Sequence, residues 1–336
     1  MLVDGPLVTH ALRDVPAAAR ALEDGGYDGV YTFEGPHDPF LPLVLAAEAT
    51  ERLELMTAVA IAFARSPMTL AAQANDLQLL SGGRFHLGLG SQIKPHIERR
   101  FSMPWSAPAT RMRELVLAVR AIWTAWQDRT PLAFEGEHYT HTLMTPFFDP
   151  GPNPFGVPSV WLGGVGPRMT EVAGEVADGF LVHPFCTAQS LLEVTLPALE
   201  RGRSRSTIAA PIQVALPVMV ATGATDADLA AATDAVRAQI AFYASTPAYR
   251  IVLEVHGWGD LQPRLQACTR SGDWAAMAAL VHDDLLEAVA IVAPPDEVAP
   301  AIDERYGPLL DRVALNAPYS APPEIWQGIA AELRVS

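Results

Sequence analysis

Short apolar segments alternate with amphipathic, helix-like segments from one end of this 336-residue chain to the other. This order is typical of parallel strands joined by helical crossovers, because each crossover must bury one apolar face against the sheet. The predicted strands are residues 2–7, 27–33, 53–63, 84–89, 159–162, 180–183, 212–221 and 311–316. Eight such strand–helix units predict an α/β fold of the (β/α)8 TIM-barrel type.

Two stretches interrupt this alternation, so the predicted barrel carries insertions within a single domain covering residues 1–336. Residues 129–158 are rich in proline and predict a surface loop or short hairpin, and residues 226–290 predict a helical excursion. The rival fold is a doubly wound open sheet. It requires a G-x-G-x-x-G fingerprint after the first strand, which this chain lacks, so the barrel is favoured.

The charge balance and the cysteines limit the partners and the compartment. With 23 basic and 38 acidic side chains, the net charge of −15 repels phosphate backbones and argues against a nucleic-acid partner. The two cysteines, Cys186 and Cys268, show no C-x-x-C spacing and indicate a reducing compartment. No apolar run is long enough to span a bilayer and no secretory leader is evident, so we expect a cytoplasmic protein without a membrane partner.

A glycine-rich turn follows the predicted strand 159–162 and leads into a predicted helix. Glycines at such a turn let backbone N–H groups approach an anion, and the helix start adds unpaired donors and positive dipole character. Arg168 can add a charged fork to the same anion. The alternative is that the glycines serve only the geometry of a tight turn. The candidate phosphate-binding residues are Gly163, Gly164, Val165, Gly166, Pro167 and Arg168.

The loop after the predicted strand 27–33 carries the candidate catalytic residues Glu34 and His37. At the carboxyl end of a barrel strand, a carboxylate or imidazole can manage a proton beside a reacting ring. The alternative is a polar loop in which Asp38 prepares a turn before Pro39.

Small and polar residues end the predicted strand 84–89. Glycines there permit close approach of a planar ring, and neighbouring polar side chains can hydrogen-bond its edge or its tail. The alternative is a strand end that simply needs small residues. The candidate cofactor-binding residues are Gly88, Gly90, Ser91, Gln92 and His96. His183, at the end of strand 180–183, either lines a pocket or takes part in ordinary packing. His86 is expected to be a buried histidine with a backbone partner.

Several motifs in order along the chain resemble the luciferase-like monooxygenase superfamily. They are Tyr-Asp-Gly-Val-Tyr-Thr at 27–32, Ala-Arg-Ser-Pro at 64–67, Leu-Ser-Gly-Gly-Arg-Phe-His-Leu-Gly-Leu-Gly at 80–90, Arg-Met-Arg-Glu at 111–114, the 163–168 turn and Glu-Val-Ala-Asp-Gly at 175–179. The chain is most similar to the branch assigned to coenzyme F420, a deazaflavin. In some F420 relatives a glutamate acid follows the fourth strand, whereas this chain has Gln92, Ile93 and Lys94 there.

The resemblance implies a TIM barrel with the flavin-type ring at its C-terminal mouth and the phosphate tail along the glycine turn. It also implies a cis non-proline peptide bond between Ala58 and Val59 that backs the ring, and a homodimer. No set of metal ligands converges from the strand ends, so no metal is expected.

Three functions follow from these observations. The first is an F420-dependent oxidoreductase that transfers a hydride between the deazaflavin and a small organic substrate. The second is an FMN-dependent two-component monooxygenase supplied by a separate flavin reductase. The third, from another class, is a catalytically inactive barrel that acts as a binding or assembly subunit.

Overall fold

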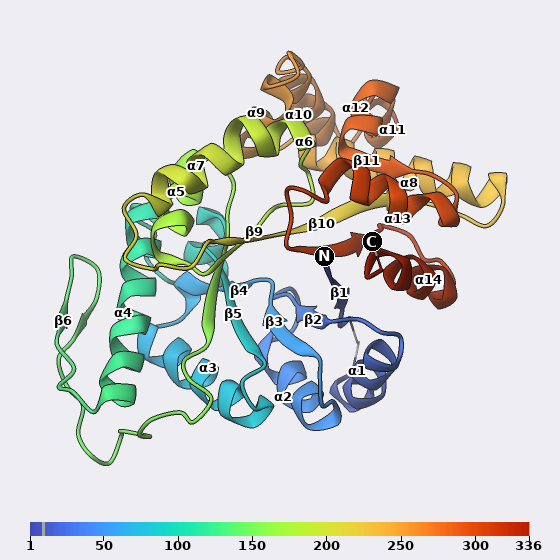
Figure 1. Ribbon diagram of the computed structural model, residues 1–336. Coiled ribbons are helices and arrows are strands. Elements are labelled where there is room, and N and C mark those ends of the chain that lie inside the picture. Colours follow the sequence, from blue (N-terminus) through green and yellow to red (C-terminus); the bar gives the residue numbers. More distant parts are fainter. Residues whose placement is uncertain (9–10, 336) are drawn as a thin grey trace.

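Eight parallel strands close into a ring in the computed structural model, which describes residues 1–8 and 11–335. Each strand pairs with the next, and the last pairs with the first through Val3 and Val313, so the ring has no open edge (Figure 1). The strands of the ring are β1 (Leu2–Pro6), β2 (Gly29–Thr32), β3 (Glu54–Thr57), β5 (Phe85–Gly90), β8 (Ser159–Gly163), β9 (Gly179–Leu181), β10 (Gln213–Ala221) and β12 (Arg312–Asn316). The predicted (β/α)8 TIM barrel is confirmed.

Helices surround the ring, and local sequence signals explain where they begin and end. In α3, for example, the Ser66 hydroxyl accepts a hydrogen bond from the Thr69 N–H, Pro67 occupies the first turn, and Gly82 ends the helix with a φ of 69°. The helices around the ring are α1 (Val15–Asp24), α2 (Phe40–Ala49), α3 (Pro67–Ser81), α4 (Pro108–Asp128), α5 (Pro167–Val176), α6 (Ala188–Ser190), α7 (Leu196–Arg203), α13 (Pro295–Tyr306) and α14 (Pro323–Leu333).

The predicted strand 53–63 is shorter than expected. After β3 the chain leaves the ladder at Ala58 and Val59, resumes as β4 (Ala60–Ile61) beside β5, and ends in a 3-10 turn (Ala62–Ala64). A further short strand, β11 (Ala290–Val292), which was not expected, pairs with the end of β10 directly after the helical excursion. Both departures lie at the carboxyl ends of ring strands.

Two segments add structure outside the ring. Residues 129–158 include an antiparallel pair, β6 (Phe134–Glu135) and β7 (Thr140–His141), anchored by the Glu114 carboxylate, which accepts three backbone N–H groups from 137–139. After β10, a group of helices packs around a hydrophobic cluster of its own. These helices are α8 (Asp226–Ala244), α9 (Arg250–Glu254), α10 (Leu261–Ser271), α11 (Trp274–Ala279) and α12 (Asp283–Val289).

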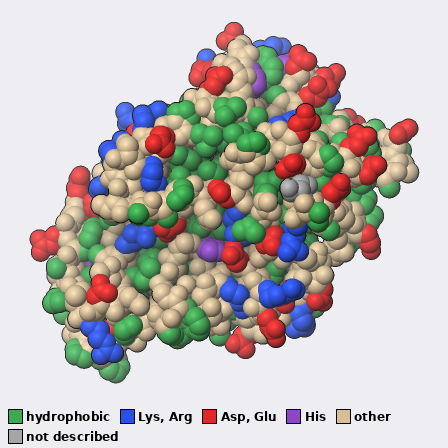
Figure 2. Space-filling model, in the orientation of Figure 1, with side chains coloured by type: hydrophobic (Ala, Val, Ile, Leu, Met, Phe, Trp, Pro, Cys, Tyr) green, Lys and Arg blue, Asp and Glu red, His purple; other side chains and the backbone are tan. Residues whose placement is uncertain are grey.

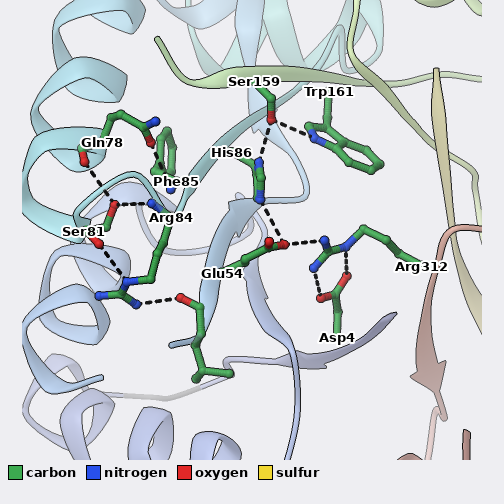
Figure 3. Close-up of polar contacts among 11 residues, drawn as sticks. Asp4, Glu54, Gln78, Ser81, Arg84, Phe85, His86, Ser159, Trp161 and Arg312 are labelled. Atoms are coloured by element: carbon green, nitrogen blue, oxygen red, sulfur yellow. Dashed lines mark hydrogen bonds and ion pairs between the residues drawn. The ribbon is translucent and has the colours of Figure 1, made fainter. Parts of the chain in front are cut away.

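The interior of the barrel is polar at the amino ends of the strands. Arg312 from β12 forms a two-pronged ion pair with Asp4 and also contacts Glu54 (Figure 3). Glu54 in turn contacts His86 (3.1 Å), whose other ring nitrogen lies 2.6 Å from the Ser159 hydroxyl. His86 therefore has side-chain partners, and the expected backbone partner was wrong. Burial favours the neutral form of Glu54, but the His86 hydrogen bond and the charge of Arg312 outweigh it and lower the pKa of Glu54 to about 2.

Charged side chains of both signs are interspersed over the face of the molecule drawn in Figure 2. Within residues 1–8 and 11–335, no helix combines the length and the apolar character needed to cross a membrane.

Candidate functional site

An apolar cavity of about 230 Å³ occupies the carboxyl half of the barrel interior. TIM barrels normally fill this space with layers of bulky side chains. Here several inward positions carry small or compact residues, among them Gly163, Ala215, Pro217 and Ala314, and the missing side-chain volume leaves the cavity. The other residues that line it are Asp4, Tyr31, Met56, Ala58, Val59, Gly164, Val165, Leu181, Val182, His183, Pro184, Leu216 and Val313.

One side of the cavity mouth is the segment between β3 and β4. The peptide bond between Ala58 and Val59 is cis, at the position that the family resemblance implies. The Ala58 N–H donates to the Thr32 carbonyl (2.6 Å) and the Val59 carbonyl accepts from the Glu34 N–H (3.1 Å), which ties this segment to the loop after β2. Ala58 and Val59 both line the cavity, as a cofactor-binding role requires.

The glycines of β5 have a structural reason that the sequence did not show. A Cβ added at Gly88 would lie 1.7 Å from the Thr57 carbonyl oxygen, and one at Gly90 would lie 2.6 Å from a Val59 methyl group. The Thr57 hydroxyl also bridges the Gly88 N–H (2.9 Å) and carbonyl (2.8 Å). These glycines thus make room for the segment that carries the cis bond. Their predicted contact with a planar ring stays a prediction.

The predicted glycine turn lies beside this segment, because an added Cβ at Gly163 would lie 3.0 Å from a Val59 methyl group. Gly163, Gly164 and Val165 line the cavity, and Gly164, Val165 and Gly166 also line a smaller cavity of about 40 Å³ beneath the turn. Gly166 has a φ of 86°, which only glycine adopts readily, and no side chain caps the helix α5 that begins at Pro167. Arg168 lies exposed on the first turn of α5. The turn therefore presents its backbone and a helix start without a side-chain cap at the rim, an arrangement suited to an anion.

The predicted catalytic pair is only partly assembled. The Glu34 carboxylate is buried and accepts from the Ile61 N–H (2.7 Å) and from Arg65 (2.6 Å), whose other nitrogen contacts Asp38 (3.1 Å). This contact set holds the loop after β2 against the segment after β4. His37 is exposed at the surface of that loop. The structure does not bring the two side chains to the cavity wall, and their role in proton transfer stays a prediction.

The residues after β5 lie farther from the cavity. Ser91 donates to the Gln92 carbonyl (3.1 Å), and Gln92, with a φ of 58°, accepts the Ile93 N–H on its own side chain (2.9 Å). His96 is exposed and begins the π-helical turn His96–Arg100. The described cavity wall includes none of Ser91, Gln92 and His96, so their predicted cofactor contacts require a ligand that extends beyond the cavity.

His183 is the polar residue that the sequence left undecided and that the structure places at the site. It lines both cavities and lies two residues after β9, which ends at Leu181 and not at His183 as expected. Its ring lies between Tyr243 of α8 and Tyr249, with centroid distances of 4.7 and 4.3 Å. Burial lowers the pKa of His183 to about 4, so the ring is neutral at pH 7. Among the described residues, no group of three or more His, Cys, Asp or Glu side chains is arranged to hold a metal ion.

A closed parallel barrel with an apolar cavity under the carboxyl ends of its strands defines a TIM-barrel protein with a candidate ligand site at the usual mouth. The chain belongs to the luciferase-like monooxygenase family, whose model matches residues 2–312.

Similar proteins include reductases and a monooxygenase. The chain is 56% identical over 312 residues to the uncharacterized protein Rv1360 of Mycobacterium tuberculosis, covering 93% of this chain and 92% of the relative. It is 28% identical over 300 residues to the 5,10-methylenetetrahydromethanopterin reductase of Archaeoglobus fulgidus, covering 85% and 83%. Among solved structures, the coenzyme F420 dependent tetrahydromethanopterin reductase of Methanopyrus kandleri has a TM-score of 0.80 at 21% identity, covering 99% and 98%. The EDTA monooxygenase of Chelativorans sp. BNC1 has a TM-score of 0.74 at 16% identity, covering 99% and 92%.

Proposed function

We propose that this protein is an oxidoreductase that binds coenzyme F420 and moves a hydride between the deazaflavin ring and a small organic substrate. The observation that carries the proposal is the apolar cavity, whose wall contains the Ala58–Val59 segment and, next to it, Gly163, Gly164 and Val165 of the glycine turn. The relation to a methylenetetrahydromethanopterin reductase supports the same reaction class. When bound, the cofactor supplies the hydride chemistry, and the protein supplies binding and orientation.

The residues at the mouth fit the two ends of such a cofactor. The apolar wall suits a planar ring, and the backbone of Gly163, Gly164 and Val165 lies beside it for a phosphate-bearing tail. Because the chain carries a net charge of −15, an anionic ligand needs local donors to bind. The start of α5 and the exposed Arg168 are such donors.

The second candidate is an FMN-dependent monooxygenase that receives reduced flavin from a separate reductase. The family description and the fold shared with the EDTA monooxygenase favour it. The same cavity and turn suit FMN, which also joins a planar ring to a phosphate. The third candidate, a barrel without catalysis, has no need of an open cavity at the mouth.

Fluorescence titration of the purified protein with F420 and with FMN separates the three functions. We expect saturable binding of F420 and much weaker binding of FMN. Preference for FMN would replace the proposal with the monooxygenase, and failure to bind either would favour a binding or assembly subunit.

The phosphate assignment has its own test, the substitution Arg168→Glu. Replacing the rim cation with an anion should weaken F420 binding about tenfold or more at low salt. The matched control is Arg264→Glu on α10. It replaces an exposed arginine outside the turn and changes the net charge by the same amount. Equal affinities in the two variants would refute the assignment. A bulky residue at Gly164 is a poorer test, because even a Cβ there would lie 2.5 Å from the Met169 side chain.

We also propose that the protein acts as a cytoplasmic homodimer. The adjacent helices α2 and α3 carry exposed apolar side chains, including Leu41 (54% exposed) and Leu79 (51%), which a second copy could cover. Sedimentation velocity that gives only monomer at micromolar concentration would contradict the dimer.

A further inference from the structure

Tyr31 and His183 line the apolar cavity, and one polar atom of each side chain has no hydrogen-bond partner in the described chain. Tyr31 points inward from β2, and His183 follows β9. Within the described chain, no residue hydrogen-bonds the Tyr31 hydroxyl or the Nε2 atom of His183. Neither atom is sealed from solvent, so both have access to open space. Both atoms are therefore free to meet a ligand in the cavity that Tyr31 and His183 line.

The contacts of His183 define which nitrogen is available. Its Nδ1 atom accepts a hydrogen bond from the Phe185 N–H (3.1 Å). A neutral imidazole that accepts at Nδ1 carries its proton on Nε2, so the open atom is a donor. The two flanking tyrosine rings hold the imidazole in this orientation.

Tyr31 is a donor as well. Burial raises the pKa of its phenol, and the negative charge of Asp4 raises it further, so the hydroxyl keeps its proton at every physiological pH. No hydrogen bond joins the Tyr31 hydroxyl to Asp4, whose two oxygens accept from Arg312 instead (2.6 and 2.9 Å).

We propose that Tyr31 and His183 recognise an uncharged carbonyl oxygen inside the cavity. The two open donors call for an acceptor, while the apolar wall excludes a charged group that has no counter-ion. The lining contains no Lys or Arg, and Arg312 beneath it is paired with Asp4 and Glu54. The ligand that fits is therefore a neutral carbonyl compound, in preference to a carboxylate or a hydrocarbon. The inference deepens the proposed function and rests on it for the cavity being the reaction site.

The volume of the cavity limits the size of the carbonyl compound. An apolar protein cavity of roughly 150 Å³ is enough to bind benzene. The cavity of about 230 Å³ thus accepts a single substituted ring or one end of a larger ring system. The carbonyl can belong to the substrate or to the ring of the cofactor, and the experiment below separates these two sources.

The test compares three probes of similar size, namely acetophenone, ethylbenzene and benzoate, by ligand-observed NMR titration. Acetophenone has the carbonyl, ethylbenzene lacks it, and benzoate carries a charge. We expect acetophenone to bind best and benzoate not to bind. In Tyr31→Phe and in His183→Phe, the preference for acetophenone over ethylbenzene should fall about three- to tenfold, the effect of one lost hydrogen bond. The affinity for ethylbenzene should stay the same.

Tyr27→Phe is the matched control, because Tyr27 is a half-buried tyrosine just before β2 that lies outside the wall of this cavity. An unchanged acetophenone preference in both Tyr31→Phe and His183→Phe would overturn the inference. Near-UV circular dichroism checks that each variant is folded. If His183→Phe does not fold, Tyr31→Phe decides alone, because it removes only a hydroxyl group that has no partner in the protein.

Repeating the titration with protein saturated by F420 identifies the source of the carbonyl. Loss of acetophenone binding assigns the two donors to the ring of the cofactor, and retained binding assigns them to the substrate. Either result supports carbonyl recognition. The inference and the proposed function can fail separately. If the protein does not bind F420 but its preference for acetophenone falls in the variants, only the function is rejected. If the protein binds F420 but shows no such preference, only the inference is rejected.

Discussion

His183 lies where three separate parts of the chain meet. The residue lies two positions after β9, one flanking ring comes from α8, and the other comes from the turn Pro247–Tyr249. The sequence places His183 at the correct end of a strand, but its burial depends on residues about 60 positions away. Tyr31 was overlooked for the same reason, because the cavity that it lines is formed together with small residues distant in sequence, such as Ala215 and Ala314.

The depressed pKa of His183 predicts a specific loss of stability in acid. Its pKa is about 4 in the folded protein against 6.5 in the unfolded chain, so the unfolded state binds more protons between these values. The contribution of the neutral ring is fully present above pH 6.5 and is lost as the pH falls toward 4, by roughly 3 kcal/mol in total. Urea unfolding at pH 7 and pH 4.5 should show a larger loss of stability in the wild type than in His183→Phe. Equal losses would show that His183 is not buried in its neutral form.

Among the candidate acids, Glu34 shows how a correct location can come with a different role. The sequence places it on the loop after the second strand, at the catalytic end of the barrel. The structure pairs it with Arg65, from the Ala-Arg-Ser-Pro motif whose arginine had no assigned role. An ion pair between residues 31 positions apart follows from the meeting of two loops, which no local pattern reveals.

Between elements, the contact of β5 with the segment after β3 leaves no room for a side chain. Gly88→Ala would place a methyl group 1.7 Å from the Thr57 carbonyl oxygen, and the backbone of one strand must move to relieve the clash. We expect a loss of about 3 kcal/mol or more in the free energy of unfolding, at the upper end of overpacking effects. The matched control is Gly328→Ala in α14, where an added Cβ meets no atom and alanine favours the helix. That variant should be neutral or slightly more stable. A mild effect of Gly88→Ala would mean that the two strands are not in close contact.

Most of the strand–helix alternation could be predicted because each element follows from its own residues. Helix α3 shows this well, since Ser66, Pro67 and Gly82 mark its ends locally. The break after Thr57 could not be predicted from composition, because the run of Ala, Val and Ile that follows is also typical of a buried strand. Its cause lies across the ladder, where Gly88 admits the Thr57 carbonyl. The short strand β11 is likewise defined by its partner β10, and its three residues carry too little pattern of their own.

For the molecule as a whole, the barrel interior divides into two halves with different chemistry. The amino half is filled by the chain of contacts from Asp4 through Arg312, Glu54 and His86 to Ser159 (Figure 3). The carboxyl half is apolar and open. In TIM barrels the amino face serves stability and the carboxyl face serves function. The polar half therefore acts as a floor that closes the ring beneath the cavity.

Arg312 is central to this floor because it joins the last strand to the first, across 308 residues of sequence. Arg312→Met leaves the carboxylates of Asp4 and Glu54 without their cation in a buried setting, which should lower the free energy of unfolding by about 3–5 kcal/mol. Asp4→Asn in the same chain removes one of the stranded charges, so the double variant should recover at least about 1 kcal/mol relative to Arg312→Met. Urea unfolding at pH 7 measures the free energy of unfolding of the wild type, of Arg312→Met and of the double variant. The control is Arg250→Met, which breaks a half-exposed pair with Glu254 and should cost only about 0.5 kcal/mol. If Arg312→Met costs no more than Arg250→Met, the floor does not hold the ring closed, and packing of β1 against β12 is sufficient.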